Sequence, residues 1–108
     1  MPDYSKTVIY KIEHIENDNL LYVGHTTNWN NRKTKHKSCC NNKNNKAYNS
    51  KLYQMIRNNG GWENFKMIEV EKYPCNYNRE AERRENEVMK KFKTNMNTNR
   101  SYISEDEL

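Results

Sequence analysis

The sequence predicts an α/β fold of the α+β type, with one three-stranded antiparallel sheet flanked by helices. Two apolar segments near the N-terminus are separated by a short turn, which is typical of a strand hairpin. The periodicity of four later segments favours helix, helix, strand, helix, so the expected order is β-β-α-α-β-α. The 108 residues contain no internal repeat or linker, and we expect a single domain over 1–108, with a motif-bearing core at about 6–100 and a polar tail at 101–108.

The first two segments form the predicted hairpin. In KTVIYKIEHI (6–15), the apolar residues Val8, Tyr10 and Ile12 recur at every second position, which is the period of a strand. The turn residues ENDN follow, and LLYVGHT (20–26) is a second apolar run. We therefore expect these two strands to pair antiparallel.

A helix is predicted next, from Trp29 to about Cys40. Asn28 is a suitable N-cap, because its side-chain oxygen can accept a hydrogen bond from the first helical turn. Arg32 and His36 stand about one turn apart on this helix, and they share a face with Trp29 and Cys40. A guanidinium and an imidazole are therefore expected on the same side.

A second helix and a third strand are predicted in the middle of the chain. In YNSKLYQMIRNNGG (48–61), Leu52 and Ile56 lie on one apolar stripe with Tyr48, and the glycine pair would end the helix. NFKMIEVEKY (64–73) alternates imperfectly between apolar and polar residues and is predicted to be a strand, which the following proline ends.

The clearest predicted helix is NREAERRENEVMKKFK (78–93), in which acids come early and lysines late, as the helix dipole favours. Glu85 lies four residues after Ala81 and four before Met89, on or beside the apolar stripe. A carboxylate on an inward face is costly unless it holds a partner. Glu85 therefore stands apart from the other glutamates of the helix, which can form surface pairs with neighbouring arginines.

The composition favours a polyanionic partner and a reducing compartment. The net charge is +5 and the isoelectric point is about 9.1. The three cysteines cannot all pair with one another and no signal peptide is recognisable, so we expect an intracellular protein of the cytoplasm or nucleus. No apolar run is long enough to span a membrane, and the spacing of His and Cys fits no common zinc site.

Five residues provide the groups that phosphodiester hydrolysis needs: a base for water, cations for the developing charge, and a Lewis acid or proton donor at the leaving oxygen. The fork of Arg32 can bind two phosphate oxygens, and His36 can transfer protons near neutral pH. Glu85 can hold one Mg²⁺, which takes its other ligands from water and substrate. Tyr10 and Tyr22 lie on adjacent strands and can face the same side.

The order and spacing of these residues resemble the GIY-YIG nuclease domain over about residues 6–100. The matching elements are VIY (8–10), YVG (22–24), Arg32, His36, NSKLYQMIRNNGGWENF (49–65), REN (84–86) and NMN (95–97). Either tripeptide alone is a weak signal, whereas both at family spacing, followed by Arg, His and a late helical Glu, are specific. The stretch GHTTNWNNRKTKHK is also similar to stand-alone members found in large DNA viruses.

The resemblance implies a DNA endonuclease that uses one Mg²⁺ or Mn²⁺ ion, needs no small-molecule cofactor, and leaves 5′-phosphate and 3′-hydroxyl ends. Tyr10 matches a tyrosine that takes part in activating water, as the base or within its hydrogen-bond relay, and Tyr22 matches one that orients water or phosphate. Arg32 matches the residue that neutralises the scissile phosphate, and His36 the one that assists proton transfer. Glu85 matches the metal-binding carboxylate.

The resemblance also extends to residues around these five. Asn97, with Asn99 as the alternative, matches a supporting asparagine of the site, and Gly24 matches a glycine that lets the backbone pass close to it. Val8 replaces the first glycine of the family motif, and the role of His25 stays open. We expect Gly24 to contact the DNA together with three lysines: Lys33, Lys35 and Lys37.

Two other functions are compatible with the sequence. A non-catalytic nucleic-acid-binding module could keep the fold, and metal-dependent nicking that is lost in Glu85→Ala would exclude it. A protein-interaction domain could use the acidic tail at 105–108, and a failure to bind DNA at low salt would favour that function. No recognition domain is visible, so strict sequence specificity would need a homodimer or a separate recognition partner.

Overall fold

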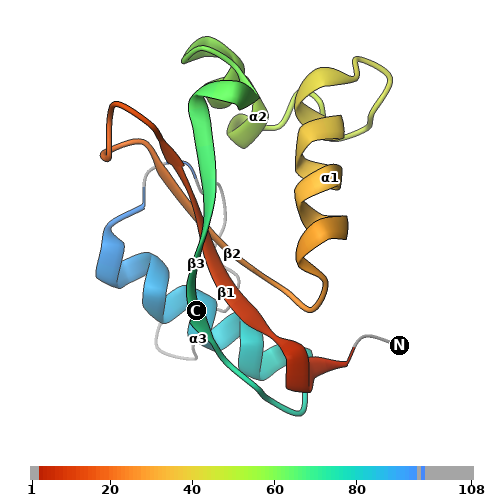
Figure 1. Cartoon of the computed structure of the whole chain (residues 1–108), viewed down its shortest axis with the longest axis vertical. Helices are drawn as coiled ribbons and strands as arrows, with labels where there is room; N and C mark the ends of the chain where they lie inside the picture. The colour runs from red at the N-terminus through yellow and green to blue at the C-terminus, as the bar shows by residue number, and fades with distance from the viewer. Residues whose placement is uncertain (1–2, 95, 97–108) are drawn as a thin grey trace, which may run out of the picture.

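A three-stranded antiparallel sheet lies at the centre of the molecule (Figure 1). The computed structural model describes residues 3–94 and 96. The strands are β1 (Val8–His14), β2 (Leu21–Thr26) and β3 (Phe65–Lys72), and their order in the sheet is β2-β1-β3. The predicted hairpin is confirmed, because β1 pairs antiparallel with β2. β3 pairs antiparallel with the other side of β1, which makes β1 the central strand.

The helices follow the predicted order. They are α1 (Trp29–Asn41), α2 (Lys51–Asn58) and α3 (Asn78–Phe92), with short 3-10 turns η1 (Tyr4–Lys6) and η2 (Trp62–Asn64). The α+β fold and the order β-β-α-α-β-α are therefore confirmed. Within the described part of the chain, no helix has the length and apolar character needed to cross a bilayer.

The second helix begins at Lys51, later than predicted. The chain before it forms turns, in which the Asn45 side chain accepts a hydrogen bond from the Ala47 N–H at 2.9 Å and the Ala47 carbonyl accepts one from the Ser50 N–H at 2.9 Å. Such local bonds compete with helix formation. Tyr48 consequently lies outside the helix, with its ring 3.7 Å from the guanidinium carbon of Arg57.

Helices cover both faces of the sheet, with α1 and α2 on one side and α3 on the other (Figure 1). Tyr10 belongs to the core beneath α1 and α2, whereas Ile9 and Val23 pack against Val88 and Met89 of α3. The predicted alternation of buried and exposed residues in β1 is therefore only partly observed, because helices cover the central strand on both faces. Consecutive residues of β1 consequently serve two separate cores.

The connection from β2 to α1 places the first helix beside the sheet. The Thr26 hydroxyl donates to the Asn28 carbonyl and accepts from the Asn28 N–H, both at 3.0 Å. The Asn28 side chain accepts from the Asn31 N–H at 3.1 Å, which confirms the predicted N-cap. This short, bonded corner holds the first turns of α1, with Arg32, next to the end of β2.

Candidate active site

The two tyrosines of the hairpin lie on one face of the sheet, as predicted. Tyr10 is opposite Gly24 in the ladder and Tyr22 is opposite Ile12, so the tyrosines are diagonal neighbours. Their ring centroids are 6.4 Å apart. The ring of Trp29 packs edge-on against Tyr10 with centroids 6.0 Å apart. Tyr10 is thereby buried at 1% exposure, and its hydroxyl can bond only to groups brought to it by the fold.

Gly24 is required by the position of the Tyr10 hydroxyl. A Cβ atom added at Gly24 would lie 2.5 Å from Tyr10 Oη and 2.7 Å from Cζ, closer than real Cβ contacts. The glycine is buried and its missing side chain makes room for the phenol. The backbone at Gly24 thus passes close to the ring of Tyr10, as the predicted close approach to the site requires. A contact between Gly24 and DNA stays a prediction.

We expect Gly24→Ala to destabilise the fold by about 1–3 kcal/mol, the usual cost of overpacking a core. Urea unfolding measures this cost. In a Tyr10→Ala background the added methyl group has space, so the same substitution should cost much less there. An equal cost in both backgrounds would show that the contact with Tyr10 is not the reason for glycine.

His36 lies between two tyrosine hydroxyls. Its Nε2 atom is 2.6 Å from Tyr10 Oη, and its Nδ1 atom is 2.7 Å from Tyr53 Oη. The ring of Trp62 stacks on the imidazole with an interplanar angle of 21° and centroids 6.1 Å apart. The sequence prediction placed His36 in the site but missed Tyr53. Tyr53 directly follows Leu52 and precedes Ile56 by three residues, which puts it on the buried face of α2.

Burial keeps this cluster neutral near pH 7. Burial, followed by the positive charges of Arg32 and Lys35, lowers the pKa of His36 to about 4. Burial raises the pKa of Tyr10 well above its usual value, with a further increase from Tyr22. The lowered pKa of His36 and the raised pKa of Tyr10 keep the proton on the phenol at rest, so the two rings form a hydrogen-bonded neutral pair.

Glu85 is buried on α3 at 6% exposure, as its position on the apolar stripe predicted. His25 Nδ1 is 3.0 Å from Glu85 Oε1, and His25 Nε2 is 3.2 Å from Asn78 Oδ1. Although burial opposes a charge on the imidazole, the hydrogen bond to Glu85 raises the pKa of His25. His25, whose role the sequence left open, is therefore a hydrogen-bond partner of Glu85. Asn78 is bonded to the other nitrogen of the same ring.

Opposite charges from two helices act on the same hydroxyl groups. Burial, and after it the negative charge of Glu85, raise the pKa of Tyr22 to about 12, while Arg32 opposes this change. The same two charges act with the same signs on Tyr10. Direct contacts bring Glu85 and Arg32 toward one cleft, because Glu85 Oε1 is 3.0 Å from His25 Nδ1, and His25 and Arg32 line the same cleft. The structure places Tyr10 beside Tyr22 and bonds His36 to Tyr10, while the catalytic roles of the five residues stay predictions.

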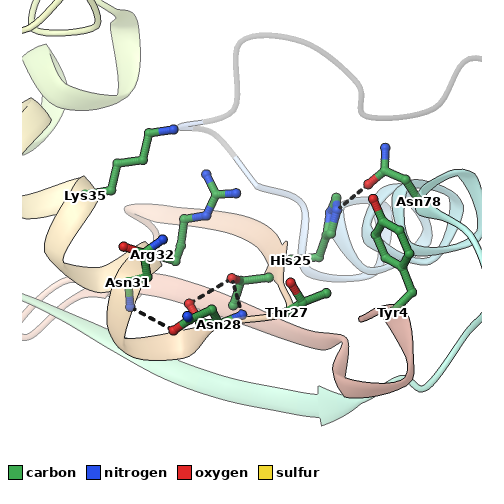
Figure 2. Close-up of a pocket in the computed structure, with 9 residues that line it drawn as sticks. Tyr4, His25, Thr27, Asn28, Asn31, Arg32, Lys35 and Asn78 are labelled. Carbon is green, nitrogen blue, oxygen red and sulfur yellow. Dashed lines mark hydrogen bonds between the residues drawn. The ribbon is translucent and has the colours of Figure 1, made fainter. Parts of the chain in front are cut away.

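An open cleft of about 240 Å³ is lined by Arg32, alone among these five residues, and by His25, the hydrogen-bond partner of Glu85 (Figure 2). Arg32 and Lys35 of α1 project along one wall, and His25, Asn78 and Tyr4 lie across from them (Figure 2). The full lining is Tyr4, His25, Thr26, Thr27, Asn28, Asn31, Arg32, Lys35 and Asn78. The lining is polar and carries two cations, which suits an anionic ligand such as a phosphate group.

A family model of the GIY-YIG catalytic domain matches residues 6–99. The chain belongs to the GIY-YIG family. GIY-YIG domains are endonuclease domains that act on DNA, and the match includes every residue discussed above except Tyr4. Comparisons with curated proteins and with solved structures found no match. The similarity to viral GIY-YIG proteins stays a prediction.

The donor set of this GIY-YIG site fits one hard divalent cation. Among residues 3–94 and 96, no group of three or more His, Cys, Asp or Glu side chains could hold a metal by itself. Mg²⁺ commonly takes one or two carboxylates and completes its shell with water and substrate phosphate. Glu85 offers such a carboxylate, and its hydrogen bond to His25 engages Oε1 and leaves the second oxygen as a further acceptor.

The remaining predicted residues of the GIY-YIG domain have different positions. Lys33, Lys35 and Lys37 are all exposed on α1, but of these three Lys35 alone lines the described cleft. Asn97 and Asn99 lie outside the described residues. Contacts of Lys33 and Lys37 with DNA, and the supporting role of either asparagine, stay predictions.

Proposed function

We propose that this GIY-YIG domain is a metal-dependent DNA endonuclease that leaves 5′-phosphate and 3′-hydroxyl ends. The strongest support is that residues of α1 and α3, from opposite faces of the sheet, act on the same tyrosine hydroxyls of the hairpin. Arg32 from α1 and Glu85 from α3 both act on the hydroxyls of Tyr10 and Tyr22, and His36 is bonded to one of them. These are the groups that hydrolysis of a phosphodiester requires.

Activation of water in this proposal passes through Tyr10. The Tyr10 hydroxyl accepts a proton from the attacking water and gives its own proton to Nε2 of His36, 2.6 Å away. The water oxygen forms a bond to phosphorus, and the bond from phosphorus to the 3′-oxygen breaks. The 3′-oxygen takes a proton from solvent. Tyr22 orients the water or the phosphate from the neighbouring strand.

The charge that develops on the phosphate is met by groups at the cleft. Arg32 lines the cleft and presents a fork that matches two phosphate oxygens. One Mg²⁺ or Mn²⁺ ion held by Glu85 would act as a Lewis acid toward the phosphate and the leaving oxygen. His25, with Asn78 behind it, holds the Glu85 carboxylate in a fixed orientation.

Incubation of supercoiled plasmid with the protein tests this proposal. We expect nicked and linear DNA with Mg²⁺ or Mn²⁺ and intact plasmid with excess chelator. Labelling of the products by a polynucleotide kinase should require prior removal of a 5′-phosphate, and a polymerase should extend the 3′ ends directly. DNA binding without metal-dependent nicking would instead favour the non-catalytic binding module.

We expect Lys35→Ala to weaken DNA binding and to reduce the slope of log affinity against log salt by about one, the value for one lost phosphate contact. Lys66→Ala is the control, since Lys66 is an exposed lysine on β3 that does not line the cleft. Fluorescence anisotropy over a salt series measures both slopes. Equal slopes for the two variants would mean that the DNA does not bind in the cleft.

A further inference from the structure

The described part of the chain contains a buried row of hydrogen-bonding groups that continues past the residues assigned above. It runs from Tyr10 through both ring nitrogens of His36 to the hydroxyl of Tyr53 on α2, with contacts of 2.6 and 2.7 Å. Tyr53 is 8% exposed and His36 is 3% exposed, so solvent has little access to this row. Two short contacts on opposite sides of one imidazole fix the orientation of the ring, and the directions in which the two hydroxyls donate decide which nitrogen carries its proton.

We propose that Tyr53 is the positioning residue of His36: it accepts a hydrogen bond from Nδ1–H and so keeps Nε2 unprotonated and directed at the Tyr10 hydroxyl. The consequence for catalysis rests on the proposed nuclease function. The positioning itself rests on the two contacts and on burial, and it holds for the molecule whatever the reaction.

The contacts of Tyr53 support this direction. A neutral imidazole has one N–H donor and one acceptor, so one neighbouring hydroxyl must donate to it and the other must accept from it. The Cys39 thiol is buried in the same core, and burial followed by interaction with that thiol raises the pKa of the Tyr53 hydroxyl, which therefore keeps its proton. If the Tyr53 proton points to that sulfur, its oxygen faces Nδ1 as an acceptor. Tyr10 must then donate to Nε2.

The reverse arrangement would oppose the chemistry. If Nε2 carried the proton, His36 would donate to Tyr10 and could not accept the proton that Tyr10 gives up. Rotation of the ring by 180° would put carbon atoms in place of both nitrogens and leave two buried hydroxyls without these bonds, which is costly. The Tyr53 hydroxyl therefore selects one ring orientation and one tautomer.

Long-range ¹H–¹⁵N spectra of protein labelled in its histidine rings test the proposal at pH 7. The chain has three histidines, and His36→Gln identifies the His36 signals. We expect the wild-type His36 ring to be neutral with its proton on Nδ1. A proton on Nε2 in the wild type would overturn the proposal, and this measurement needs no variant at position 53.

The variant Tyr53→Phe keeps the ring and removes the hydroxyl. We expect its His36 spectrum to change to the Nε2–H form or to a mixture of the two tautomers, and the single-turnover cleavage rate to fall about 10–100-fold, as for other partners that orient a reacting group. The affinity for DNA should stay unchanged. An unaltered Nδ1–H spectrum in Tyr53→Phe would overturn the proposal.

Tyr48→Phe is the matched control, because Tyr48 is a half-buried tyrosine just before α2 whose ring packs on Arg57. It should leave the His36 spectrum and the rate unchanged, and an equal loss in both variants would contradict the role of Tyr53. If the wild type does not cleave DNA, the nuclease proposal fails. The ring spectra then still decide whether Tyr53 positions His36.

Discussion

Replacement of Glu85 by Gln is expected to lower metal-dependent plasmid cleavage by about 10³-fold or more. Glu85 is the carboxylate proposed to hold the divalent ion, and Lewis-acid stabilisation worth about 4 kcal/mol corresponds to a rate factor of this size. Glutamine has nearly the same shape and can still accept a hydrogen bond from His25, so the fold should survive. The measurement is the single-turnover rate in saturating Mg²⁺, together with Mn²⁺ binding followed by its electron paramagnetic resonance signal.

Glu87→Gln is the matched control for this experiment. Glu87 is an exposed glutamate of the same helix and its carboxylate pairs with Arg84 at 2.9 Å. This variant should cleave DNA and bind Mn²⁺ like the wild type. Cleavage by Glu85→Gln at the wild-type rate would exclude Glu85 as the metal ligand. Loss of cleavage with unchanged Mn²⁺ binding would place the ion elsewhere.

Acidification is expected to unfold this protein in part through His36. The pKa of a histidine in an unfolded chain is about 6.5, whereas burial and nearby positive charges lower that of His36 to about 4. Between these values the unfolded chain binds a proton that the folded state excludes. The contribution is therefore fully present above pH 6.5 and is lost as the pH falls through 4, by about 3 kcal/mol.

The difference between wild type and His36→Gln isolates this contribution. Urea unfolding at intervals from pH 7.5 to pH 4 gives the free energy of unfolding of each protein. The wild type should lose about 3 kcal/mol more than the variant over this range. Groups such as Glu71, whose pKa is lowered mainly by its hydrogen bond to Arg84, contribute equally to both proteins and cancel. His25 has a raised pKa, so its contribution to the free energy of unfolding changes with pH in the opposite direction. It does so in both proteins and also cancels. Parallel curves would contradict a neutral, buried His36.

Much of the fold and the central part of the site could be predicted from the sequence. Period-two alternation marked β1, the N-cap at Asn28 marked the start of α1, and the acid on the apolar stripe of α3 marked Glu85 as buried. Each of these signals is local, because it depends on residues within a few turns or on direct strand neighbours. The order of Tyr10, Tyr22, Arg32, His36 and Glu85 then matched a known family.

What the sequence could not provide is contact between distant segments. Tyr53 bonds His36 across 17 positions of the chain and His25 bonds Glu85 across 60, and no periodicity relates such pairs. The place of β1 in the centre of the sheet is also non-local, since it depends on the side on which β3 pairs. Lys35 could not be distinguished from Lys33 and Lys37 by sequence, because the distinction depends on which face of α1 borders the cleft.

The division of the molecule into two cores, one on each side of β1, has a consequence for when it can cut. His36 comes from the layer of α1 and α2, and Glu85 from the opposite layer, which is the last helix to be synthesised among those described. A nascent or half-melted chain in which either layer is detached carries an incomplete set of reacting groups. Cleavage would thus be confined to fully assembled molecules, and immature or damaged copies would leave the surrounding DNA intact.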